Sequence, residues 1–111
     1  MQILVNSDNH IVLHRKLSNF VDTEINRILD RFSPDLTRIE AHLSDEHAFK
    51  AGPRTKRCLL EARPKEHQSL TVTADSPDLL IAVTGAAHKM QRLLDSTFGR
   101  IEEKRPFLAL E

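Results

Sequence analysis

The spacing of apolar residues changes along this chain, and the order of the changes restricts the fold more than any other feature. Between residues 15 and 32, apolar residues recur at steps of three and four, which is the pattern of an amphipathic helix. Residues 38–43, 57–63 and 70–74 instead alternate apolar and polar side chains, which is the pattern of half-buried strands. A second stripe of helical spacing then runs from Leu79 to Ile101.

Short signals at the element ends complete the predicted order. Residues 2–6 are β-prone and predict a first strand. The segment 33–35 (SPD) predicts the end of the first helix, because the residue before a proline avoids helical backbone. The segment 76–78 (SPD) predicts the start of the last helix, since Ser is a preferred N-cap and Pro suits the first turn. We therefore expect the second helix to run from Pro77 to about Lys104.

The predicted order is β-α-β-β-β-α, which is an α+β fold. Each strand offers one apolar face and each helix one apolar stripe, so the economical arrangement packs both helices on one face of a four-stranded sheet. The other face of the sheet is then open to water. Because 111 residues are about the length of one domain, we expect a single domain over residues 1–105 and a short tail over residues 106–111.

The composition excludes several classes of protein. Hydrophobic residues make up 40% and charged residues 29% of the chain, as in a soluble globular domain, which excludes a disordered tail or a fibre. The single cysteine, Cys58, excludes an intramolecular disulfide and fits a reducing compartment. The longest nearly apolar stretch, residues 79–83, is too short to cross a bilayer, and the first residues do not have the pattern of a signal peptide. We expect a cytoplasmic protein without a membrane partner.

The net charge is zero, from 16 basic and 16 acidic residues, but the charges are unevenly distributed. Residues 50–67 carry a net charge of +4 and residues 1–49 a net charge of −3. Helical geometry also gathers basic residues on one flank of each predicted helix, with acidic residues on the other flank. If these basic flanks and the 50–57 loop meet, they form a groove suited to a phosphate backbone. The alternative is an ordinary solvated surface of mixed charge.

Ten basic residues are the candidates for contact with nucleic acid. They are Lys16, Arg27 and Arg31 in the first helix, Lys50, Arg54, Lys56 and Arg57 in the 50–57 loop, and Lys89, Arg92 and Arg100 in the second helix.

The chain contains no catalytic or metal-binding motif. Its six histidines form neither an HExxH motif nor a zinc-finger spacing, so we interpret them as surface residues, with His42 on the polar face of a strand and His88 on an exposed helical face. Cys58 falls on the core side of its strand and is expected to be a buried thiol rather than a nucleophile. We therefore expect neither an enzyme nor a protein that holds a cofactor, a metal or a small-molecule substrate.

The second helical segment resembles that of a known family. Residues 78–83 (DLLIAV) and 88–94 (HKMQRLL) are similar to the signature helix of the ribosome hibernation factors, which reads roughly D-x-Y-x-A-I-D and then D-K-L-E-R-Q-L. This family is also called ribosome-associated inhibitor, ribosomal subunit interface protein or sigma-54 modulation protein. The first helix fits the same family, and the resemblance extends over about residues 1–105. The matching positions of the first helix are Leu17, Phe20, Val21, Ile25, Arg27, Ile28 and Phe32.

The resemblance implies a fold similar to double-stranded RNA-binding domains. It also implies binding to the small ribosomal subunit where mRNA and tRNA would sit, which silences translation in stationary phase. Arg27, Lys89 and Arg92 match basic positions that face ribosomal RNA in the family. The chain also departs from the family pattern at five positions. Ser18, Glu24 and Ser96 stand where Arg or Lys is common, Leu80 where Tyr is usual, and Thr84 where a second Asp is usual.

Two hypotheses of function follow. The first is a short-type hibernation factor whose basic residues pair with phosphates of ribosomal RNA, which positions the domain without reading sequence. The second is a protein-interaction module of the same fold that has lost ribosome binding, which the neutral net charge and the missing basic residues favour. The second hypothesis predicts self-association or a protein partner at the open sheet face, where Leu4 and Leu59 are expected to lie.

Overall fold

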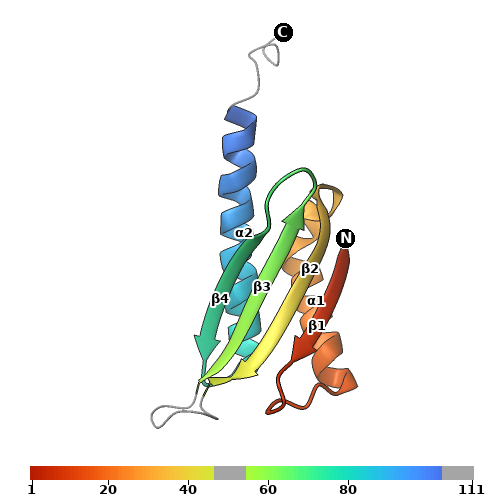
Figure 1. Cartoon of the computed structure of the whole chain (residues 1–111), viewed down its shortest axis with the longest axis vertical. Coiled ribbons are helices and arrows are strands. Elements are labelled where there is room, and N and C mark those ends of the chain that lie inside the picture. The colour runs from red at the N-terminus through yellow and green to blue at the C-terminus, as the bar shows by residue number, and fades with distance from the viewer. Residues whose placement is uncertain (47–54, 104–111) are drawn as a thin grey trace.

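The computed structural model describes residues 1–46 and 55–103, the last four of them by their backbone alone. Its elements follow the order β-α-β-β-β-α, so the predicted α+β fold is confirmed (Figure 1). A short 3-10 helix, η1 (Asp30–Asp35), follows the first α-helix. The strands are β1 (Gln2–Ser7), β2 (Leu36–Asp45), β3 (Lys56–Pro64) and β4 (Leu70–Ser76), and the α-helices are α1 (Arg15–Leu29) and α2 (Leu79–Glu103).

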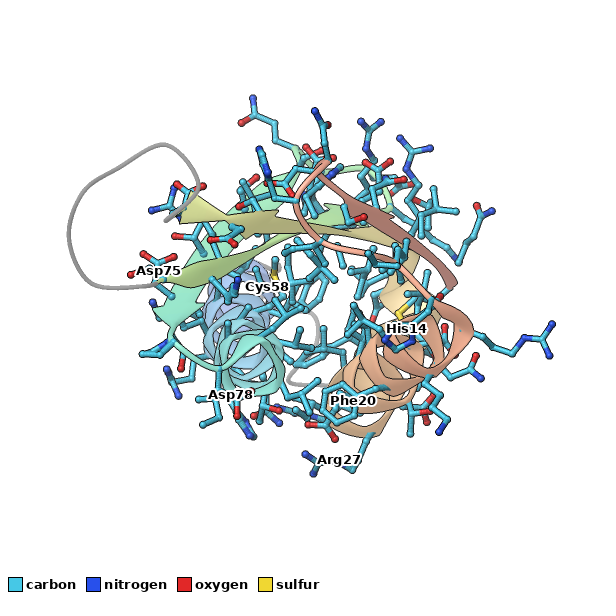
Figure 2. The ribbon with its side chains drawn as sticks, turned by 90° about the horizontal axis from the view of Figure 1, so that it is seen from below. His14, Phe20, Arg27, Cys58, Asp75 and Asp78 are labelled. Carbon is cyan, nitrogen blue, oxygen red and sulfur yellow. The ribbon has the colours of Figure 1, made fainter. Side chains whose placement is uncertain are left out.

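The four strands form one sheet in the order β1-β2-β3-β4. β1 and β2 are parallel, because α1 crosses over between them, whereas β2–β3 and β3–β4 are antiparallel. Both helices cover the same face of the sheet, and the opposite face is open (Figure 2). Leu4 and Leu59 lie half-buried on this open face, as predicted.

The core lies between the sheet and the two helices. Val21 and Ile25 of α1 and Val83 and Met90 of α2 are fully buried there. Alternate residues of the two central strands meet them from the sheet: Ile39, Ala41, Leu43, Cys58, Leu60 and Ala62. The alternation that predicted the strands is therefore the alternation between the helix-covered face and the open face.

The start of α2 differs from the prediction. The helix begins at Leu79 rather than at Pro77, and its N-cap is Asp78 rather than Ser76. Asp78 Oδ1 accepts a hydrogen bond from Leu80 N at 2.8 Å, which satisfies one of the free donors of the first turn. Ser76 Oγ accepts a hydrogen bond from Asp78 N at 3.1 Å, so Ser76 shapes the turn that leads into the helix.

The end of α1 also differs from the prediction. The α-helix ends at Leu29 rather than at Phe32, and the chain continues through Pro34 as η1. Phe32 is nevertheless buried, because the tighter 3-10 turn keeps it on the core side. The predicted end of α2 near Lys104 and the predicted tail over residues 106–111 lie outside the described residues.

Candidate nucleic-acid interface

The two α-helices lie side by side on the sheet and run in the same direction. Lys16 near the start of α1 lines the same hollow as Leu80 near the start of α2, and Arg31, just after α1, pairs with Asp95 far along α2. Their outward sides form one face, which we call the helix surface. It carries four of the predicted basic residues: Lys16, Arg27, Arg31 and Arg92.

An apolar groove separates the N-terminal halves of the two helices, and we call it the interhelix groove. It consists of two hollows of about 400 and 270 Å³ that share Phe20 and Leu80. Leu80 and Ile81 are 43% and 62% exposed, so the groove is open to solvent. The remaining lining residues are His14, Lys16, Leu17, Thr84, Gly85 and His88.

Sequence reasoning missed this groove. The available signal was the apolar run over residues 79–83, which is wider than one helical stripe, so some of its members have to face outward. His88, predicted on an exposed face, is half-buried and lines the groove. His14 has a structural role, since its Nδ1 accepts a hydrogen bond from Leu17 N at 3.1 Å and caps α1.

A hydrogen-bonded cluster joins the helices beside the groove. The Glu24 carboxylate accepts two bonds from Arg27, at 2.9 and 3.1 Å, and one from Thr84 Oγ1 at 2.7 Å. The bonds from Arg27 and then Thr84 hold the pKa of Glu24 below its usual value, and the bond to Glu24 raises the pKa of Arg27. Glu24 and Thr84 are two of the five departures from the family pattern, and they contact each other. These two departures therefore form one interhelical contact.

Arg31 contacts α2 directly, through Asp95, and indirectly, through the ring of its neighbour Phe32. Its guanidinium lies 2.5 Å from the Asp95 carboxylate and 4.3 Å from the centre of the Phe32 ring. Phe32 in turn packs against Phe98 of α2, with ring centres 5.9 Å apart. Arg31 therefore joins the end of α1 to the acidic flank of α2.

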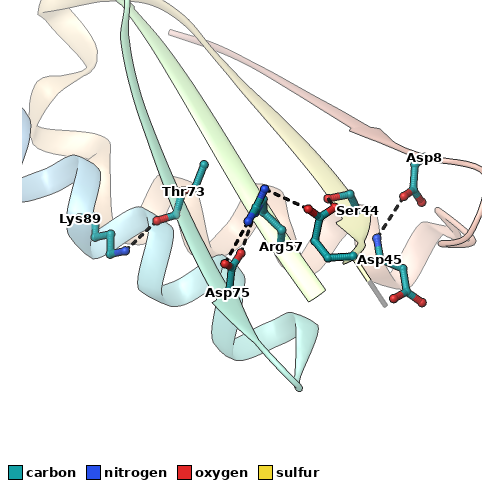
Figure 3. Close-up of polar contacts among 8 residues, drawn as sticks. Asp8, Ser44, Asp45, Arg57, Thr73, Asp75 and Lys89 are labelled. Atoms are coloured by element: carbon teal, nitrogen blue, oxygen red, sulfur yellow. Dashed lines mark hydrogen bonds and ion pairs between the residues drawn. The ribbon is translucent and has the colours of Figure 1, made fainter. Parts of the chain in front are cut away.

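The basic flanks of the two helices do not face each other. Lys89 lies on the opposite side of α2, where its Nζ donates a hydrogen bond to the Thr73 carbonyl of β4 at 2.7 Å (Figure 3). The flank of α2 that faces α1 instead carries Asp95. The structure thus places the basic flank of α1 against the acidic flank of α2.

The other predicted basic residues with described side chains lie where β2, β3 and β4 come together. Lys56 pairs with Asp45 at 2.6 Å, and Arg57 pairs with Asp75 at 2.8 Å and with Glu46 at 3.0 Å (Figure 3 draws the Arg57 contacts). The hydrogen bond that Arg57 donates to the Asp75 carboxylate raises the pKa of Arg57. We call these five residues the strand-end cluster. Lys50 and Arg54 lie outside the described residues, and Arg100 is described by its backbone alone.

The predicted basic residues therefore differ in how available they are. Arg27, Arg31, Lys56 and Arg57 are paired with carboxylates, and Lys89 is bound to a carbonyl. Lys16 and Arg92 are exposed and have no ion-pair partner within the described ranges. A phosphate can bind these two without displacing a carboxylate.

Other chemistry has little support in the part of the chain that the structure describes. Cys58 lies beneath the sheet, as predicted (Figure 2), and burial raises the pKa of its thiol to about 12, so the reactive thiolate is scarce at neutral pH. No group of three or more His, Cys, Asp or Glu side chains in residues 1–46 and 55–99 is placed to hold a metal ion. No helix within the described segments is long and apolar enough to span a membrane.

Comparisons with known proteins identify the family. A family model described as sigma 54 modulation protein / S30EA ribosomal protein matches residues 4–102. A sequence search among curated proteins finds no match.

Two solved structures share the fold, each at 14% sequence identity. A ribosomal subunit interface protein from Coxiella burnetii superposes with a TM-score of 0.75 over 89% of this chain and 99% of that one. The N-terminal domain of Thermus thermophilus Protein Y superposes with a TM-score of 0.71 over 87% of this chain and 99% of that one. By the family match over residues 4–102, with the fold in agreement, this chain belongs to the sigma 54 modulation protein / S30EA ribosomal protein family.

Proposed function

We propose that this protein is a ribosome-associated translation inhibitor, or hibernation factor, that binds ribosomal RNA of the small subunit in the cytoplasm under stress or in stationary phase. The family match over residues 4–102 carries the proposal, because it covers nearly the whole described domain. The protein acts sterically, by occupying the subunit, and the proposal requires no reaction and no cofactor.

The helix surface is the proposed RNA-binding face. Lys16 and Arg92 contribute most, because their charges are not neutralised by a carboxylate within the described residues. Arg27 and Arg31 contribute less, since each is paired with a carboxylate. Contacts of this kind hold a phosphate backbone in place without reading its sequence.

The other predicted residues rank lower in the proposal. Lys89 is bound to the β4 backbone, and Lys56 and Arg57 are engaged in the strand-end cluster. Lys50, Arg54 and Arg100 stay predictions from the sequence.

Cosedimentation of the full chain with purified small ribosomal subunits tests the proposal. At about 50 mM salt we expect the protein in the ribosomal fraction, with a clear loss at about 200 mM, because phosphate contacts weaken as salt rises. Absence from the ribosomal fraction even at the lower salt concentration would contradict it.

A protein-interaction module that has lost ribosome binding is the second candidate. The observation that favours it is the pairing of Arg27, Arg31, Lys56 and Arg57 with carboxylates, which leaves few free cations. A pull-down from lysate with and without nuclease separates the two candidates. A ribosomal partner bound through RNA is lost on nuclease treatment, whereas a directly bound protein is retained.

A further inference from the structure

The interhelix groove is an apolar site that phosphate binding does not explain. Leu80 and Ile81 are well exposed there, beside Phe20. We propose that the groove binds residues 104–111 of a second copy of this chain, so that two copies associate by exchanging these segments. The proposal does not depend on ribosome binding.

The apolar side chains of residues 104–111 suit the apolar lining of the groove. Residues 104–111 read KRPFLALE, with two basic residues, an apolar middle and an acidic residue. The side chains of Phe107, Leu108 and Leu110 are suited to the apolar lining. Burial of one such side chain tightens a complex by about tenfold or more, which is the scale of a hot spot in an interface.

The order of charges also matches in one direction. Lys16 lies at the end of the groove where both helices begin, and Asp95 lies farther along, past Glu24. A segment that runs from Asp95 toward Lys16 brings Glu111 to Lys16, which no described carboxylate neutralises. Asp95 and Glu24 are already paired with Arg31 and Arg27, so that end of the groove carries no comparable free charge. Such complementarity sets the register and direction of an interface.

The lengths agree with this placement. From Leu80 to Asp95 the helix rises about 22 Å, at 1.5 Å per residue. An extended segment from residue 104 to residue 111 spans about 23 Å, at roughly 3.3 Å per residue. One segment is therefore long enough to cover the groove from end to end.

The chain's own segment is too short to bring Phe107 to the Ile81 end of its own groove. Glu103 lies about 33 Å along α2 from Ile81, whereas Phe107 can extend at most about 14 Å beyond Glu103. Phe107 thus falls about 19 Å short of Ile81 even when the segment folds straight back along the helix. A second copy has no such limit, and reciprocal exchange gives a closed two-fold dimer.

Sedimentation velocity of the full chain between about 5 and 200 μM tests the proposal. We expect a concentration-dependent dimer in which Ile81→Asp and Phe107→Asp each weaken association by about tenfold or more, as the loss of one buried apolar side chain implies. Val12→Asp is the matched control, because Val12 is 78% exposed and does not line the groove. It is expected to associate like the unchanged chain.

A mixture of the two variants makes the test specific. Ile81→Asp keeps an intact segment and Phe107→Asp keeps an intact groove, so an equimolar mixture forms one intact contact and is expected to associate more tightly than either variant alone. A monomer throughout the concentration range would overturn the proposal. It would also be overturned by loss of association in Ile81→Asp but not in Phe107→Asp, which would place a different part of the second copy in the groove. Thermal melts of both variants show whether the fold is retained.

Discussion

The helix surface and the strand-end cluster both carry basic residues, but only the helix surface carries cations that no carboxylate neutralises within the described residues. Lys56 and Arg57 lie directly opposite Asp45 and Asp75 in the register of the sheet, so each faces an opposite charge across the strands. Such cross-strand pairs stabilise a sheet. The basic residues of the strand-end cluster therefore stabilise the sheet.

On the helix surface Asp95 and Glu24 are bound by Arg31 and Arg27, which leaves Lys16 and Arg92 without a carboxylate partner among the described residues. Asp95 lies one helical turn from Arg92 and is bound by Arg31 from the other helix. Glu24 is bound by Arg27 and Thr84. The difference between the two regions shows that the position of an acid, rather than the count of bases, decides which cations are free to bind a phosphate.

Both regions rest on one core, so a core substitution has the largest expected effect. Leu60→Ala removes a fully buried side chain of β3 and is expected to lower the free energy of unfolding by about 2–5 kcal/mol, measured by urea denaturation. Leu59→Ala, one residue away on the open face, is the matched control. It is expected to lower the free energy of unfolding by a smaller amount. An equal loss of unfolding free energy in the two variants would mean that the open face is as tightly packed as the core.

The interhelical contact of Thr84 has the next largest expected effect. Thr84→Val removes the hydrogen bond to the Glu24 carboxylate and keeps the shape of the side chain. We therefore expect the free energy of unfolding to fall by about 1 kcal/mol. Urea denaturation measures it. An unchanged stability would show that the two departures from the family pattern do not support each other.

The same cluster predicts a pH dependence. The pKa of Glu24 is lowered from 4.5 in the folded protein, so its ionised form stabilises the fold above that pH, and this contribution is lost as the pH falls through the folded pKa. The difference in unfolding free energy between the unchanged chain and Glu24→Gln is therefore expected to shrink as the pH is lowered below 4.5. A difference that stays constant from neutral to acidic pH would sink this explanation.

Removal of one of the two carboxylate partners of Arg57 has the smallest expected effect on stability. Asp75→Asn removes an ion pair whose side chains are 38% and 43% exposed, and pairs of this kind contribute less than about 1 kcal/mol. The substitution also adds one net positive charge beside Arg57, which keeps its pair with Glu46, so retention on small subunits is expected to increase slightly. A decrease would show that the strand-end cluster as it stands contributes to binding.

The periodicity of the sequence predicts most of the fold because burial alternates in the same way. Leu60 and Cys58 face the core as their alternation with Leu59 indicates. The predicted start of α2 was two residues too early, because Ser76 and Asp78 are both good N-caps. Only the geometry of the turn decides between them.

The candidate site was less predictable. Helical angles place Arg31 on a basic flank, but they do not show that Asp95, 64 residues away, binds it. The exposure of Ile81 likewise depends on how the two helices sit on the sheet. Contacts between distant segments, which local patterns do not contain, therefore decide which predicted residues are available.

Binding to small ribosomal subunits by two matched double variants tests the central claim most directly. Lys16→Gln with Arg92→Gln, and Lys56→Gln with Arg57→Gln, each remove two positive charges, from the helix surface and from the strand-end cluster respectively. The affinity is measured over a series of salt concentrations. We predict that the helix-surface variant reduces the slope of log affinity against log salt by about 2, whereas the strand-end variant leaves it nearly unchanged. Equal reductions in both variants, or a larger one in the strand-end variant, would contradict the account.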